Sequence, residues 1–130
     1  NGELVLVVDD EPNVRDITAA ILARHGYRVL VADDGTEAVA LFAARNQEIS
    51  LVITDLNMPN LDGSALANVV SRINPAVKIL AISGMEGTES NPSKASPFAS
   101  AFLLKPFKID LLLSTVHRLL SPTAPENPPK

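Results

Sequence analysis

The chain has 130 residues and a formal net charge of −4 at pH 7; 46% of its residues are hydrophobic and only 4% are aromatic. These values predict one domain with an aliphatic core and exclude a disordered chain. The absence of a basic run excludes direct nucleic-acid binding. The lack of cysteine is typical of a protein in the reducing cytoplasm. The apolar runs are only as long as strands, so we predict no membrane contact by this segment, although a parent protein could be membrane-anchored.

Short apolar runs alternate with segments of helical periodicity along the chain. In chain order we predict a strand at Leu4–Val8, a helix from Pro12 to about Arg24, a strand at Arg28–Ala32, a helix after Gly35 to about Asn46, a strand at Leu51–Thr54, a helix after Asp62-Gly63 to Ile73, strands at Val77–Ile82 and Ala101–Leu104, and a helix over Ile109–Leu120. This alternation predicts a doubly wound α/β fold, with a parallel sheet and helices on both faces.

The apolar residues at helical spacing are the expected inward faces of these helices. In the first helix they are Val14, Ile17, Ile21 and Leu22, and in the third they include Leu66 and Ile73. Such a stripe is expected to lie against the sheet.

Two segments interrupt this pattern. Gly84–Ser100 should hold a fourth helix but is rich in Gly, Pro and Ser, so we expect at most a short helix near Pro92–Ala95 within a mobile loop. Ser121–Lys130 carries four prolines in ten residues and is predicted to be a disordered tail or linker. The expected domain therefore covers residues 3–120, followed by a tail over residues 121–130.

Charged residues follow three of the predicted strands. Asp9 and Asp10 come directly after Leu4–Val8, Asp55 follows Thr54, and Lys105 follows Leu104. Because parallel strands end at the same edge of a sheet, these four side chains are expected to lie together. Three carboxylates and one amine could hold a divalent metal and receive a phosphoryl group.

Five motifs in order give the chain a family resemblance. They are Val8–Glu11, Thr54–Pro59, Asp62-Gly63, Ile82–Gly84 and Leu104–Phe107. Together they resemble the receiver domain of two-component response regulators over about Leu4 to Leu120. The resemblance implies a flavodoxin-like sheet with strand order 2-1-3-4-5. The lead-in to Asp9 and the proline-rich ending are also similar to the C-terminal receivers of hybrid sensor histidine kinases.

The resemblance implies an acceptor and a metal site. Asp55 takes the position of the phosphoacceptor, and a carboxylate can act as nucleophile on phosphorus. Asp10 resembles a direct ligand of Mg²⁺, or of Mn²⁺ in its place, together with Asp55 and the backbone carbonyl of Asn57, while Asp9 acts through water. A second interpretation of Asp9 and Asp10, capping of the helix that begins at Pro12, is compatible with the first.

Three further residues receive roles from the resemblance. Lys105 would pair with the phosphoryl oxygens, and the bond to Pro106 is typically cis in the family. Ser83 would donate a hydrogen bond to a phosphoryl oxygen and move inward on phosphorylation. Phe102 occupies the position of the switch aromatic, although a core phenylalanine is an equally good interpretation. His25 and His117 fall away from the acidic edge and receive no role.

The implied function is transfer of a phosphoryl group to Asp55 from a phosphohistidine on a sensor kinase or phosphotransfer domain. The switched surface would be the fourth helix, the strand Ala101–Leu104 and the helix Ile109–Leu120, a surface through which weak homodimers also form in the family. Such a chain is a single-domain regulator or part of a hybrid kinase, and by itself it is not a turnover enzyme.

Two alternatives remain at this point. A phosphatase of the haloacid-dehalogenase kind would need a second aspartate where Asn57 stands. A pseudo-receiver would use the fold for binding without phosphorylation, and would be indicated by loss of the acidic pair, the acceptor or the lysine.

Overall fold

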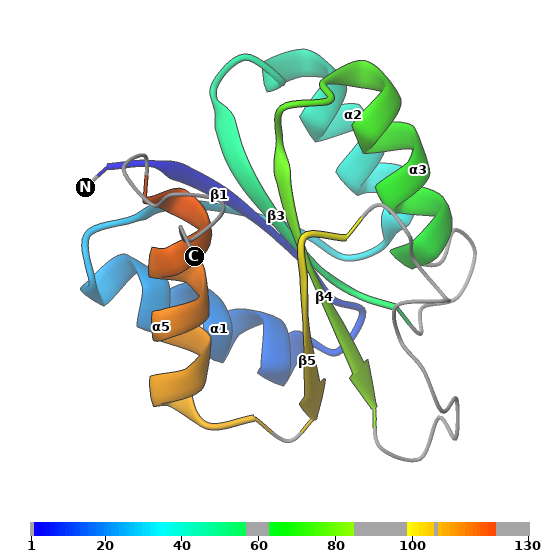
Figure 1. The fold of residues 1–130 in the computed structure, drawn as a ribbon. Helices are drawn as coiled ribbons and strands as arrows, with labels where there is room; N and C mark the ends of the chain where they lie inside the picture. The colour runs from blue at the N-terminus through cyan, green and yellow to red at the C-terminus, as the bar shows by residue number, and fades with distance from the viewer. Residues whose placement is uncertain (1, 57–62, 85–98, 106, 122–130) are drawn as a thin grey trace, which may run out of the picture.

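The structure is a computed structural model that describes residues 2–56, 63–84, 99–105 and 107–121 (Figure 1). Its elements in chain order are β1 (Leu4–Val8), α1 (Pro12–Arg24), β2 (Arg28–Ala32), α2 (Gly35–Arg45), β3 (Ile49–Asp55), α3 (Gly63–Ile73), β4 (Lys78–Gly84), β5 (Ala101–Lys105) and α5 (Ile109–Leu120). The helix expected near Pro92–Ala95 and residues 122–130 of the expected tail lie outside the described residues.

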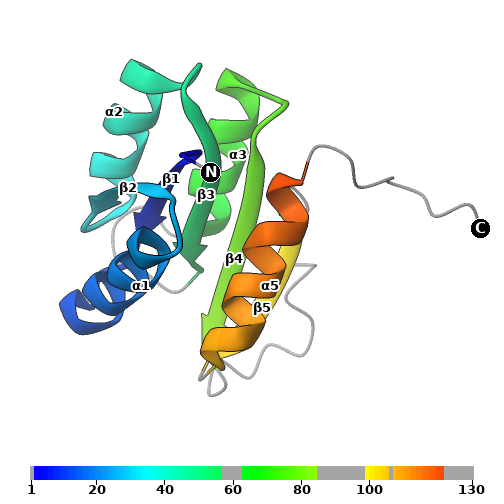
Figure 2. The same ribbon diagram turned by 90° about the vertical axis from the view of Figure 1, so that its left-hand side faces the viewer.

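The five strands form one sheet in the order β2-β1-β3-β4-β5, and every neighbouring pair is parallel. Helices α1 and α5 cover one face, and α2 and α3 cover the other (Figure 2). This arrangement confirms the predicted doubly wound fold and its strand order. It also places the first and third strands side by side at the centre of the sheet, with Val8 opposite Thr54.

The core consists of two apolar clusters, one on each face of the sheet. Leu4, Leu6 and Val8 contribute to the cluster that includes residues of α2 and α3, whereas Val5 and Val7 contribute to the cluster that includes residues of α1 and α5. Successive side chains of a strand point to opposite faces, so β1 must be apolar at all five positions. This is the physical reason for the unbroken apolar run that predicted a strand here.

Two side chains of the expected helix faces, Ile17 and Ile73, are exposed, which corrects those expectations. In α1 the buried residues are Thr18 and Leu22, and Ile17 is 58% exposed because it lies about 100° around the helix from Thr18. Ile73 is 37% exposed, since it is the last residue of α3 and no further helical turn shields it.

The strand ends also extend further than expected. β3 includes Asp55 as its last residue, and β4 continues through Ser83 to Gly84. The residues implicated in chemistry therefore belong to the hydrogen-bonded sheet or follow it directly. None of the helices within the described parts of the chain combines the length and apolarity needed to cross a membrane.

Candidate functional site

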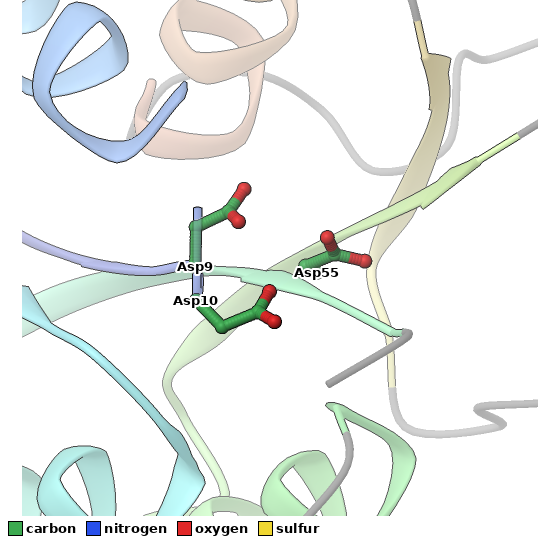
Figure 3. A group of neighbouring side chains, drawn as sticks. All are labelled: Asp9, Asp10 and Asp55. Carbon is green, nitrogen blue, oxygen red and sulfur yellow. The ribbon is translucent and has the colours of Figure 1, made fainter. Parts of the chain in front are cut away.

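The sheet itself brings the acidic side chains together. Val8 is the last residue of β1 and pairs with Thr54 of β3, so Asp9 and Asp55 follow at neighbouring positions on the same edge. Figure 3 shows the carboxylates of Asp9, Asp10 and Asp55 gathered at this point. Each contributes one oxygen to a group whose atoms all lie within 4.8 Å of one another. The sequence expectation that these three residues meet is confirmed by this geometry.

The three carboxylates differ in their access to solvent. Asp9 is 3% exposed and Asp55 is 5% exposed, whereas Asp10 lies on the surface. Mg²⁺ takes oxygen ligands and usually keeps several waters, so a cluster with one open side suits it. The donor set therefore fits a hard divalent cation.

Lys105 completes the site from the last position of β5. Its Nζ lies 2.8 Å from Asp55 Oδ2, 3.4 Å from Asp9 Oδ2 and 3.4 Å from Glu11 Oε1. Burial by itself lowers the pKa of Lys105, but the hydrogen bond to Asp55 and the charges of Asp55, Asp9 and Glu11 outweigh it, so the pKa is raised above its usual range. Lys105 is therefore a fixed cation beside Asp55.

The pKa of the Asp9 carboxyl group is also raised, but here burial is the cause. Its burial raises the pKa, and the charge of Asp55 adds to this effect, while the hydrogen bond from the Glu11 N–H and the charge of Lys105 oppose it. Burial thus outweighs the favourable contacts of Asp9, and its carboxyl group loses a proton less readily than a solvated one does. A site of this kind binds a proton or a cation more readily than an isolated carboxylate does.

The capping interpretation of the acidic pair is partly supported. The N-cap of α1 is Glu11. Asp9 Oδ1 accepts a hydrogen bond of 2.9 Å from the Glu11 N–H, which fixes the turn between β1 and α1. Asp9 therefore has a structural contact at the helix start as well as a place in the acidic cluster.

Of the remaining predicted site residues, the structure describes two and leaves two undescribed. Ser83 is 8% exposed on β4, directly after Ile82, which pairs with Asp55 in the sheet. Phe102 is half-buried on β5, which agrees with a packing role and also with a movable side chain. Asn57 and Pro106 lie outside the described residues, so the carbonyl ligand and the cis bond stay predictions.

Sequence reasoning missed one basic side chain at this edge. Arg15 Nη1 donates to the backbone oxygen of Asp9 at 3.4 Å and lies 2.7 Å from Asp33 Oδ1. Asp33 directly follows β2, so the strand-end rule that selected Asp9 and Asp55 would have selected it too. Arg15 could have been noticed as a cation in the first turns of the helix that follows the acidic pair.

Comparison with known proteins gives consistent matches. Residues 5–117 match the family described as the response regulator receiver domain. The chain is 30% identical to the response regulator receiver protein CpdR of Brucella abortus over 89% of this chain and 95% of that protein. It is 34% identical to the nitrogen assimilation regulatory protein NtrX of Azorhizobium caulinodans, of which it covers only 26%.

Solved structures give the same result at the level of the fold. The receiver domain of NtrX from Brucella abortus has a TM-score of 0.81 and 34% identity, covering 92% of this chain and 99% of that one. The response regulator TrrA of Thermotoga maritima, in complex with Mg²⁺-BeF, has a TM-score of 0.78 and 32% identity over 91% of this chain and 99% of that chain.

Proposed function

The chain belongs to the response regulator receiver family, and from this premise we propose that it accepts a phosphoryl group on Asp55 from a phosphohistidine of a sensor kinase or phosphotransfer domain. One observation supports this most strongly: the Asp55 carboxylate ends the central strand β3, 2.8 Å from Lys105 and within 4.8 Å of two further carboxylates.

The transfer makes and breaks one bond to phosphorus. A carboxylate oxygen of Asp55 attacks the phosphorus, the bond from phosphorus to the histidine nitrogen breaks, and that nitrogen keeps the electron pair. Phosphoryl transfer depends on positioning and on charge stabilisation. The ammonium of Lys105 would exchange part of its contact with Asp55 for the phosphoryl oxygens, and the Ser83 hydroxyl would donate a further hydrogen bond to them.

The acidic group would hold Mg²⁺ during this reaction. Asp10, Asp55 and the backbone carbonyl of Asn57 would be the direct ligands, with Asp9 acting through water; Mn²⁺ could replace Mg²⁺. When bound, the ion supplies positive charge that offsets the charge of the transferred group. The similar protein TrrA has been solved in complex with Mg²⁺-BeF, which supports the same chemistry here.

Phosphorylation would change the shape of one face of the domain. Inward movement of Ser83, accompanied by rotation of Phe102, would alter the face that includes β5 and α5. We propose that the chain works in the cytoplasm, as a free-standing regulator or as part of a hybrid kinase, and that it is a substrate of phosphotransfer with no turnover activity towards other phosphate esters. Weak pairing of two copies through the same face would accompany phosphorylation.

Intact mass spectrometry tests the proposal. The wild type, Asp55→Asn and Asp110→Asn are incubated with phosphoramidate, in Mg²⁺ or in a chelator. Asp110 lies on the surface in the first turn of α5, so its variant is a matched control. We expect one phosphoryl adduct in the wild type and in Asp110→Asn, dependent on Mg²⁺, and none in Asp55→Asn. Failure of the wild type to react under any condition would favour the pseudo-receiver.

A further inference from the structure

Arg15 is a charged side chain with little exposure to water. Only 15% of its side chain is exposed, although it lies in the first turns of α1. Arginine is rarely buried to this extent unless its guanidinium has fixed partners. Its Nη1 contacts Asp33 Oδ1 at 2.7 Å and the backbone oxygen of Asp9 at 3.4 Å, and its Nε lies 3.5 Å from the exposed Asp16 Oδ1. The side chain thus joins α1 to the ends of β1 and β2.

The aspartate partner, Asp33, is itself held in place. The Asp33 N–H donates to Glu37 Oε1 at 2.8 Å, and Asp34 caps α2 by accepting from the Glu37 N–H at 2.8 Å. The turn after β2 is therefore fixed to the first turn of α2. An arginine attached to this turn has a rigid anchor.

The other partner, Asp9, belongs to the acidic site. Its N–H donates to the Ala32 oxygen at 3.3 Å, and its carboxylate accepts from the Glu11 N–H. Its carboxylate also lies 3.4 Å from Lys105 Nζ. The contact from Arg15 adds a restraint on the carbonyl side of the same residue. Because this contact is made to the backbone of Asp9, it restrains the turn after β1 and therefore the position of Asp10.

Geometry and charge predict opposite effects of Arg15 on a metal. As a positive charge near a cation site, Arg15 would weaken binding of a divalent ion by repulsion. As a restraint on the turn, it would strengthen binding by holding the ligands in place, as residues behind metal ligands do. The two N–H groups of Nη1 are held in the plane of the guanidinium and can donate to both acceptors, whereas the lysine ammonium is a compact charge on a flexible stem.

We propose that Arg15 is a positioning residue, which sets the turn between β1 and α1 so that Asp9 and Asp10 converge on Asp55 and the site binds a divalent cation tightly. This inference rests on the metal site of the proposed function. It assigns to Arg15 a role in metal affinity through the position of the ligands, opposite in sign to the effect of its charge.

The test is the dissociation constant for Mg²⁺, measured by calorimetry on the wild type, Arg15→Ala, Arg15→Lys and the control Arg45→Ala. Arg45 forms an exposed ion pair of 2.8 Å with Glu48, away from the acidic edge. We expect Mg²⁺ binding to weaken roughly tenfold in both Arg15 variants. Arg45→Ala should bind as the wild type does.

The two interpretations of Arg15 predict opposite changes in the affinity for Mg²⁺. If only its charge matters, Arg15→Ala binds Mg²⁺ more tightly and Arg15→Lys is unchanged, and either result overturns the proposal. Should Arg15→Ala fail to fold, as judged by its amide NMR spectrum, Arg15→Lys decides the question, because it keeps the charge and is expected to weaken binding only if the position of the guanidinium matters. A wild type that binds no Mg²⁺ overturns the metal site itself, whereas a wild type that binds it alongside unaffected variants overturns the role of Arg15 alone.

Discussion

Two ion pairs of the same length lie at opposite ends of the strands, and their surroundings differ. Lys105 and Asp55 are 2.8 Å apart where β5 and β3 end, with side chains 21% and 6% exposed. Arg45 and Glu48 are also 2.8 Å apart, just before β3 begins, with side chains 37% and 50% exposed. The second pair is balanced and solvated, and such pairs are common on protein surfaces.

What distinguishes the first pair is the excess of buried negative charge around it. Asp9 shares Lys105 with Asp55, and burial raises the pKa of Asp9. At the other edge, the hydrogen bond from Arg45 lowers the pKa of Glu48, as in a satisfied pair. A single short distance therefore does not identify a functional site. A group of buried carboxylates that shares one cation is the stronger indication of such a site, because folding alone would not favour it.

The largest effect is expected from removing the cation of the functional pair. Lys105→Ala should slow phosphorylation by phosphoramidate roughly 100-fold, because a fixed positive charge would no longer stabilise the phosphoryl oxygens. Rates are measured by intact mass in saturating Mg²⁺. The control is Lys108→Ala, at the exposed N-cap of α5. Equal rates for the two variants would contradict the role given to Lys105.

A smaller effect is expected at the neighbouring strand. Ser83→Ala should slow the same reaction roughly tenfold, since one hydrogen bond to a charged group would be lost. Ser114, an exposed serine of α5, provides the control Ser114→Ala. If Ser83→Ala reacts at the wild-type rate, the hydroxyl of Ser83 does not contact the transferred group.

A pH-dependent effect on stability is expected from Asp9. In the folded protein burial raises the pKa of Asp9 above its unfolded value, so the folded state holds this proton more tightly. Ionised Asp9 therefore lowers stability above that pKa, and the loss disappears as pH falls through it. In a chelator at neutral pH, Asp9→Asn should be more stable than the wild type, by on the order of 1 kcal/mol.

Thermal unfolding followed by circular dichroism measures this difference. The gap between Asp9→Asn and the wild type should close as the pH is lowered into the acid range, because the wild-type carboxyl becomes neutral there. Asp110→Asn, on the exposed side of α5, serves as the control. A wild type that is more stable than Asp9→Asn at every pH would show that the Asp9 charge is fully compensated by its neighbours.

The smallest effect is expected at the solvated pair. Arg45→Ala should leave the rate of phosphorylation unchanged, because Arg45 lies at the opposite edge from Asp55 and water screens its charge. The same mass measurement checks this. A rate in Arg45→Ala as low as that of Lys105→Ala would remove the contrast between the two edges.

Much of this site could be predicted from the sequence because its residues follow strands. The apolar run Leu4–Val8 identified a buried strand, and Asp9, Asp55 and Lys105 follow from where such runs stop. The strand order that makes β1 and β3 neighbours came from the family resemblance. Composition and periodicity do not specify which strands pair.

Two features could not be predicted in this way. The exposure of Ile17 depends on which side of α1 meets the sheet, and helical spacing alone admits a stripe rotated by one residue. The contact of Arg15 with Asp33 joins residues 18 positions apart. It exists only because β2 lies beside β1, which is information about pairing.

The central claim is that Asp55 is the phosphoacceptor, and the most direct test is to locate the adduct. Borohydride reduces an aspartyl phosphate to homoserine, which tandem mass spectrometry then assigns to one position in the chain. After reaction with phosphoramidate and Mg²⁺, we predict homoserine at position 55 and at no other aspartate. Homoserine at Asp9 or Asp10, or an adduct that resists reduction, would contradict the account.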